Sequence, residues 1–225
     1  MNVLFVGNSF TFFFDVPFLF EETAHRAGID VNVDTVLRGG WTLEQFADEN
    51  DAYGKILAEK LAGGKKYDRV ILQEQSHRPA TDNEKFMNGV RDVVEKVRAN
   101  NPEAKILLYA TWGYADEFPF LQEQGWTSER MEELLREAYD RAAETYGLDV
   151  AHAGKAYLKA YRETELDPYW TDRKHPSVIG SYLSALTLFF REFPEIEEEA
   201  VEPGHMPELS DGKILRGIAY EIAHE

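Results

Sequence analysis

The chain has 225 residues, a hydrophobic fraction of 44%, and 41 Asp and Glu against 24 Lys and Arg, which gives a formal net charge of -17. This length and apolar content predict one folded domain over residues 1–225 and exclude a disordered chain. The negative charge repels phosphate backbones and anionic lipids, so neither nucleic acid nor a membrane is an expected partner. Because cysteine is absent, disulfides, thiolate catalysis and Cys-ligated zinc are excluded.

Five short apolar runs, rich in β-branched residues, are separated by segments with helical patterning. The runs cover residues 2–6, 31–37, 69–73, 105–110 and 147–151. This alternation is typical of a parallel sheet covered by helices, so the sequence predicts the α/β class. Gly7 and Asn8 end the first run with a sharp bend, which places Ser9 on the turn just past a strand.

Capping residues and prolines mark the expected helix starts. These are Asp15 with Pro17, Asp82, Thr127 or Ser128, and Pro176 with Ser177, which opens a helix through Leu188. Apolar residues at helical spacing within 86–97 and 131–142 support the helices that begin at Asp82 and at Thr127 or Ser128. The acidic stretch 195–208 is expected to cross the surface before a last helix near 211–223.

The side chains that follow each strand are the candidates for chemistry, because ligands bind beyond the carboxyl ends of the strands in open parallel sheets. Among them is Ser9, whose hydroxyl needs an imidazole to remove its proton and a carboxylate to orient that imidazole. Of the six histidines, His25 lies in the first helix, His205 in the acidic tail and His224 at the penultimate position. This leaves His77, His152 and His175, each with an acid three residues upstream.

Local conformation distinguishes these histidines. Residues three apart near a strand end tend to point to opposite faces, which disfavours His77 and His152. Asp172 and His175 lie in a predicted loop, where one turn can bring both side chains together. Taken alone, this pair is more typical of a capping Asp beside a surface His, because the same spacing recurs often in this acidic chain. Together with Ser9 it predicts a nucleophile, a base and an orienting acid.

The negative oxygen formed when a serine attacks an ester needs N–H donors aimed at it. The amide of Ser9 is one candidate, and the backbone at Gly39 or Gly40, after the second strand, can supply another. The side-chain amide of Gln75, after the third strand, is the expected third donor.

Four blocks of this sequence, in order, resemble the SGNH hydrolases, also called GDSL-type esterases and lipases. "GNSFT" resembles the serine block with Asn8 in place of the usual Asp, "LRGGW" the glycine block and "TDRKHPSVIG" the acid and base block. In "QEQS", Gln75 stands where the family has Asn. The resemblance implies a three-layer α/β/α sandwich with a five-stranded parallel sheet of flavodoxin-like topology, and catalysis by Ser9, Asp172 and His175.

The expected function is hydrolysis of a carboxylic ester through an acyl-serine, with no cofactor. A short acyl group, such as O-acetyl, on a carbohydrate or another small soluble molecule is the expected substrate. The residues expected to bind it combine aromatic planes with two cationic or polar groups. They are Trp41, His77, Arg78, Trp112 and Trp170. As written, the chain is expected to be cytoplasmic, or periplasmic or secreted if a signal peptide has been removed.

Two other classes of function remain open from the sequence. One is a non-catalytic carbohydrate-binding or interaction protein on the same scaffold, with Gln75 marking a decayed site. The other is a flavin or phosphate binder that uses "GNSFT" as its anion loop, although Asp172 and His175 would then have no role. A metal site from His77, His152, Asp172 and His175 is disfavoured, because the spacing matches no zinc pattern.

Overall fold

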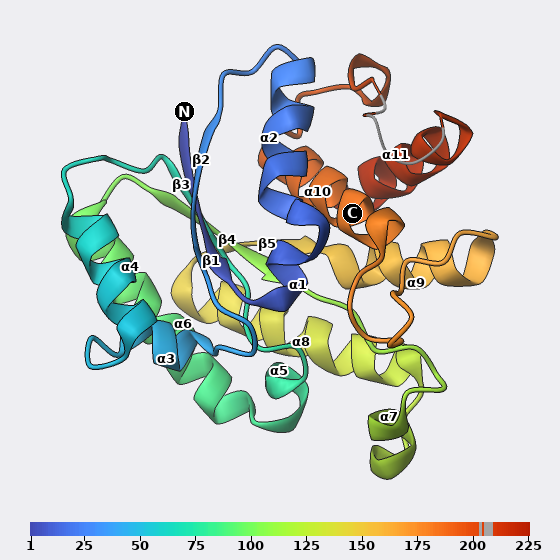
Figure 1. Cartoon of the computed structure of the whole chain (residues 1–225), viewed down its shortest axis with the longest axis horizontal. Coiled ribbons are helices and arrows are strands. Elements are labelled where there is room, and N and C mark those ends of the chain that lie inside the picture. Colours follow the sequence, from blue (N-terminus) through green and yellow to red (C-terminus); the bar gives the residue numbers. More distant parts are fainter. Residues whose placement is uncertain (203, 205–208) are drawn as a thin grey trace.

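The five strands form one parallel sheet in the order β2-β1-β3-β4-β5 (Figure 1). A computed structural model describes residues 1–202, 204 and 209–225. The strands are β1 Asn2–Gly7, β2 Asn32–Leu37, β3 Arg69–Leu72, β4 Lys105–Ala110 and β5 Asp149–His152. In the ladder, Gly7 of β1 faces Leu37 of β2, and Val6 faces Leu72 of β3. The carboxyl ends of these three neighbouring strands therefore lie at one level, and the residues that follow them meet.

Helices cover both faces of the sheet, which makes the fold a three-layer α/β/α sandwich of the α/β class, as predicted (Figure 1). One layer consists of α2 Val16–Arg26, α9 Ala153–Glu163, α10 Val178–Glu192 and α11 Leu209–Ala223. The other consists of α3 Leu43–Ala47, α4 Ala52–Ala62, α6 Asn83–Asn100 and α8 Ser128–Tyr146. A hydrophobic core lies on each face of the sheet, and alternate residues of β1 point into one or the other. Val3 and Phe5 pack against the first layer of helices, and Leu4 and Val6 pack against the second.

The predicted helix starts coincide with side-chain caps in the structure. Asp15, Asp82, Thr127 and Ser177 each accept a hydrogen bond from a backbone amide in the first turn of the helix that follows. The last predicted helix is α11. The acidic stretch 195–208 contains a short 3-10 turn, Glu198–Ala200, and residues 203 and 205–208 of it lie outside the described residues.

Several expected boundaries were wrong. Ser9 does not lie in an open turn but is the first residue of α1 Ser9–Phe12, because the Asn8 side chain accepts the amide of Phe10 and caps a helical turn. The fifth strand begins at Asp149 rather than at residue 147, since Gly147 ends α8 in the left-handed region, at a φ of 64°. The same strand ends one residue later than expected, so His152 is the last residue of β5 rather than the first residue after it. Helix α10 also continues past Leu188 to Glu192.

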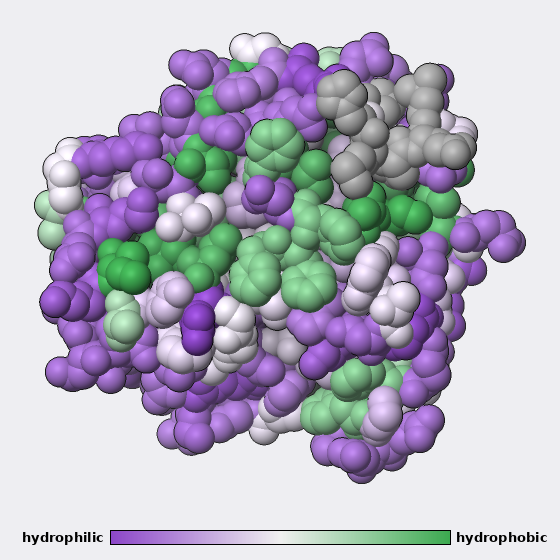
Figure 2. Space-filling model, viewed as in Figure 1, coloured by the Kyte–Doolittle hydropathy of each residue, from purple (hydrophilic) through white to green (hydrophobic). Residues whose placement is uncertain are grey.

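The face in Figure 2 has hydrophobic side chains gathered near its middle, over α1 and the start of α2, within a mostly hydrophilic surround. The exposed large hydrophobic side chains there include Phe12, Phe14 and Phe18. Among the helices that the structure describes, none is both long and apolar enough to cross a lipid bilayer.

Candidate active site

Ser9, His175 and Asp172 form a continuous hydrogen-bonded chain. The Oγ of Ser9 lies 2.9 Å from Nε2 of His175, and Nδ1 of His175 lies 2.5 Å from Oδ2 of Asp172. When the Nδ1–H group donates to the carboxylate, Nε2 is left to accept the serine proton. The residues come from the start of α1 and from the loop between α9 and α10, so opposite ends of the sequence meet here.

A single tight turn holds the acid and the base three residues apart. Oδ1 of Asp172 accepts the backbone amides of Lys174 at 3.2 Å and His175 at 3.0 Å. Arg173 takes the left-handed conformation between them, with a φ of 65°. Partial burial alone would raise the pKa of Asp172, but the hydrogen bonds from the His175 ring and the two amides outweigh it, and the pKa lies below its ordinary value. Asp172 therefore stays ionised and can orient the imidazole.

Aromatic rings enclose the imidazole of His175. The ring of Phe13 stacks on it with centroids 4.4 Å apart and planes at 9°, and Phe10 meets it edge-on at 5.3 Å. Beneath the site, Trp112 stacks between Phe10 at 4.6 Å and Tyr157 at 3.8 Å. This packing restricts the rotation of the imidazole and keeps Nε2 directed at Ser9.

A cavity of about 370 Å³ opens over Ser9. Its lining brings together the serine, the glycine block and the third-strand block that the sequence suggested. The lining residues are Asn8, Ser9, Phe10, Phe13, Gly39, Gly40, Gln75, Ser76, Lys174 and His175. Gly40 has a φ of 74°, a conformation that favours glycine and turns the backbone of this loop toward the cavity.

Comparison with known proteins gives matches only among solved structures, because no family model and no curated protein matches the sequence. A protein from Slackia heliotrinireducens, described as a candidate SGNH hydrolase, is 29% identical with a TM-score of 0.71, over 84% of this chain and 97% of its own. This similarity supports the SGNH hydrolase superfamily for the chain. Two less identical structures share the fold. A DUF4886 protein from Bacteroides uniformis has 19% identity and a TM-score of 0.76, over 98% and 93% of the two chains. A mutant acetyl-xylooligosaccharide esterase from Geobacillus has 16% identity and a TM-score of 0.57, over 87% of this chain and 94% of its own.

Gln75, at the place of the Asn of the SGNH pattern, has its two side-chain ends in different surroundings. Its Oε1 accepts the backbone amides of His77 at 3.3 Å and Arg78 at 3.2 Å. Its Nε2 makes only long contacts, 3.4 Å to Oγ of Ser76 and 3.3 Å to Nδ1 of His77. The backbone therefore anchors the oxygen, while the NH₂ group retains donor capacity toward the cavity that Gln75 lines.

Trp112 does not contact substrate as the sequence had suggested, because only 1% of it is exposed. Its indole N–H instead donates to the carbonyl of Lys174 at 2.9 Å, which secures the loop beside His175. An aromatic residue just after a buried strand can face the solvent or the core. Here α9 supplies Tyr157 as a stacking partner, and the ring lies inside.

The other four predicted substrate contacts are not among the residues that line the cavity. Trp41 donates its indole N–H to Asp51, and Arg78 forms an ion pair with Glu44. His77 lies 3.1 Å from the hydroxyl of Tyr114, and burial together with the charge of Lys174 lowers its pKa. Trp170 is 41% exposed and packs against Phe14, with ring centroids 5.3 Å apart.

His152 lies apart from these residues. Its Nε2 is 3.2 Å from Asp140, and burial lowers its pKa to about 4. It lines a separate hollow next to α11, so the four residues considered for a metal site do not converge. Within the described part of the chain, no group of three or more His, Asp and Glu side chains is placed to hold a metal ion.

Two buried polar residues that the sequence analysis did not assign connect the loops of the SGNH site. Gln73 accepts the amide of Asn8 and the hydroxyl of Thr11 on one oxygen, each at 2.9 Å. Glu74 accepts the amides of Leu43, at the start of α3, and Gln75. Asn8 completes the connection by donating to the carbonyl of Trp41 at 3.0 Å. Their signal in the sequence was polar character at the end of a buried strand, where each such group needs a partner.

Proposed function

We propose that this protein is a serine esterase that hydrolyses carboxylic esters through an acyl-serine intermediate. The observation that carries the proposal is the hydrogen-bonded chain from Ser9 through His175 to Asp172. His175 accepts the serine proton while Oγ attacks the carbonyl carbon, and it then gives that proton to the departing alcohol. Water, activated by the same imidazole, cleaves the acyl-serine and restores the hydroxyl group.

The negative oxygen of the tetrahedral intermediate would be held by three donors on the cavity wall. These are the backbone amide of Ser9, a backbone amide at Gly39 or Gly40, and the side-chain NH₂ of Gln75. Because Gln73 and Asn8 tie the serine loop to its two neighbours, the donors would be set before substrate arrives. Such preorganisation is where most of the electrostatic rate enhancement arises.

A short acyl group on a small, saccharide-like alcohol is the substrate we propose. The cavity of about 370 Å³ is suited to a small acyl group. Trp170 is exposed and its backbone amide donates to the carbonyl of His175, so its ring could stack on a sugar ring near the base. One structural relative is a mutant of an acetyl-xylooligosaccharide esterase, which makes acetylated oligosaccharides the first natural substrates to assay.

The test is hydrolysis of 4-nitrophenyl acetate, combined with covalent labelling by a fluorophosphonate. We expect the wild type to do both, and Ser9→Ala to lose labelling and at least about 1,000-fold in kcat/KM, because the nucleophile is gone. The matched control is Ser210→Ala, which removes an exposed hydroxyl from α11 and should retain both signals.

Labelling or turnover that survives Ser9→Ala would refute the nucleophile assignment. If the wild type neither turns over esters nor reacts with the probe, yet binds acetylated oligosaccharides, the protein is a non-catalytic carbohydrate binder on the same scaffold.

A further inference from the structure

Lys174 contributes a positive charge to the cavity over Ser9. It is half-buried and lines the same cavity as Ser9, Gln75 and His175. Its backbone is fixed on both sides, since its N–H donates to Asp172 at 3.2 Å and its carbonyl accepts the indole N–H of Trp112 at 2.9 Å. The direction in which the side chain leaves the loop is therefore set by the same contacts that hold His175.

No described carboxylate forms an ion pair with the ammonium group of Lys174. Its Nζ instead lies over the ring of Phe118, 5.6 Å from the centroid. Its positive charge acts on the neighbouring His77, because together with burial it lowers the pKa of that imidazole. An ammonium that is partly removed from water and lacks a counter-ion favours the binding of an anion.

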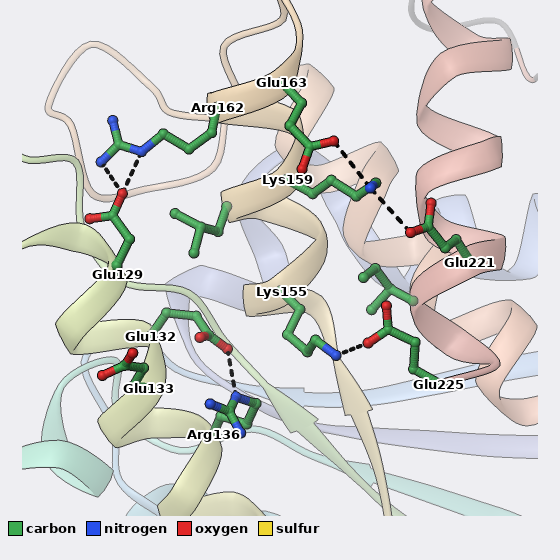
Figure 3. A pocket seen from close by; sticks show the side chains of 12 residues that line it. Glu129, Glu132, Glu133, Arg136, Lys155, Lys159, Arg162, Glu163, Glu221 and Glu225 are labelled. Carbon is green, nitrogen blue, oxygen red and sulfur yellow. Dashed lines mark hydrogen bonds and ion pairs between the residues drawn. The ribbon is translucent and has the colours of Figure 1, made fainter.

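Many basic groups elsewhere on the molecule are paired with carboxylates. Figure 3 shows a hollow of about 600 Å³ between α8, α9 and α11, whose acidic and basic side chains bind one another. Lys159 there contacts Glu163 and Glu221, each at 3.1 Å. Close to Lys174, Arg173 is bound by Asp167 and Glu117, and Arg78 is bound by Glu44. Lys174 differs from these paired groups because it lines the cavity of the nucleophile and its ammonium group contacts an aromatic ring instead of a described carboxylate.

We propose that the ester substrate carries an anionic group, such as a carboxylate, and that Lys174 selects it. The inference rests on the proposed esterase function and specifies its substrate class. The field of a chain with a net charge of -17 repels anions at long range, so recognition of an anion needs a cation at short range. The ammonium would bind the anionic group equally in the ground state and in the transition state, so its contribution should appear mainly in KM.

The experiment compares kcat/KM for one neutral and two anionic esters. 4-Nitrophenyl acetate is neutral, 4-nitrophenyl hydrogen succinate carries its carboxylate on the acyl side, and 4-acetoxybenzoate carries it on the alcohol side. We expect Lys174→Gln to lower the anionic-to-neutral ratio about tenfold for at least one anionic ester, which also locates the anionic group.

Two variants serve as controls. Lys174→Arg keeps the charge and should retain the preference. Lys105→Gln removes the same charge from the exposed first residue of β4, at the amino end of the strand and away from the site, and should leave the ratio unchanged. An unchanged ratio in Lys174→Gln for both anionic esters would overturn the proposal.

A binding measurement separates this proposal from the esterase proposal. Calorimetric titration of 4-acetoxybenzoate and of succinate into Ser9→Ala, with and without Lys174→Gln, detects the contact without turnover. Binding that depends on Lys174, in a protein whose wild type hydrolyses no ester, would reject the catalytic function while keeping the anion site. Ser9-dependent hydrolysis with no effect of Lys174 in either assay would do the reverse.

Discussion

The carboxyl group of Glu74 is fully buried beneath the active-site loops. Burial raises its pKa to about 7, although the amides of Gln75 and Leu43 and the charge of Arg78 oppose the shift. In the unfolded chain the group has an ordinary pKa of about 4.5, so the folded state holds its proton more tightly. Between these two values the folded protein binds more protons than the unfolded one, and its stability must fall as pH rises.

We expect the Glu74 contribution to the free energy of unfolding to decrease by about 2 kcal/mol between pH 5.5 and pH 8.5, and Glu74→Gln to abolish this decrease. Urea denaturation at the two pH values measures the difference. Glu84→Gln, on the exposed surface of α6, controls for the loss of one carboxylate and should keep the wild-type slope. The same pH slope in Glu74→Gln would show that the buried carboxyl does not titrate in this range.

At this scale the sequence identified residues whose role follows from local geometry. Asp172 and His175 could be paired because a loop of three residues permits one turn, and the structure closes that turn. Contacts between segments that are distant in the sequence could not be predicted from the sequence. The orientation of Trp112 depends on Tyr157 from α9, and the positions of Gln73 and Glu74 depend on the backbone of two other loops.

Helix α10 positions the loop that carries the base. The amide of Ser177 donates to the carbonyl of Pro168 at 2.8 Å, and the Ser177 hydroxyl accepts the amide of Gly180 at 3.3 Å. A Cβ atom on Gly180 would lie 2.2 Å from both the Pro168 carbonyl oxygen and the Tyr157 hydroxyl. Close packing against the loop and against α9 thus requires glycine here.

We expect Gly180→Ala to displace α10 from the loop, to destabilise the fold by about 1–3 kcal/mol and to lower ester hydrolysis at least tenfold at a temperature where the variant remains folded. Thermal unfolding and kcat/KM for 4-nitrophenyl acetate measure the two effects. Gly217→Ala in α11 is the control, because its Cβ would make an ordinary contact of 3.6 Å with Glu198. Full activity in Gly180→Ala would mean that the loop tolerates movement of the helix.

Elements with a clear period or cap were predictable from the sequence, whereas short helices were not. Helix α8 has a capping Thr127 and an amphipathic repeat over 19 residues. Helices α1, α3 Leu43–Ala47 and α5 Arg78–Thr81 have four or five residues each, too few to show a helical period. Helix α1 nevertheless matters most for the site, because its first residue is Ser9.

The whole molecule carries a large excess of negative charge, -17 at pH 7. Many of its ion pairs are exposed, and exposed pairs contribute little to stability, whereas repulsion among the excess carboxylates acts throughout the surface. We therefore expect the Tm at pH 7.5 to rise by about 2–4 °C, corresponding to about 1 kcal/mol, when NaCl increases from about 20 to 200 mM. Calorimetry measures this shift, and a Tm that falls with salt would show that ion pairing outweighs repulsion.

Ser9 and His175 are separated by 166 positions along the chain, yet their side chains share a hydrogen bond. During synthesis on a ribosome, Ser9 emerges before β2, β3, β4 and β5 are made. Until His175 has been synthesised, the imidazole that accepts the serine proton is absent. A nascent or truncated polypeptide that ends before Asp172 and His175 therefore lacks the base for Ser9, even if its sheet has assembled. Any reaction that depends on this contact can begin only after the segment that carries Asp172 and His175 has docked beside Ser9.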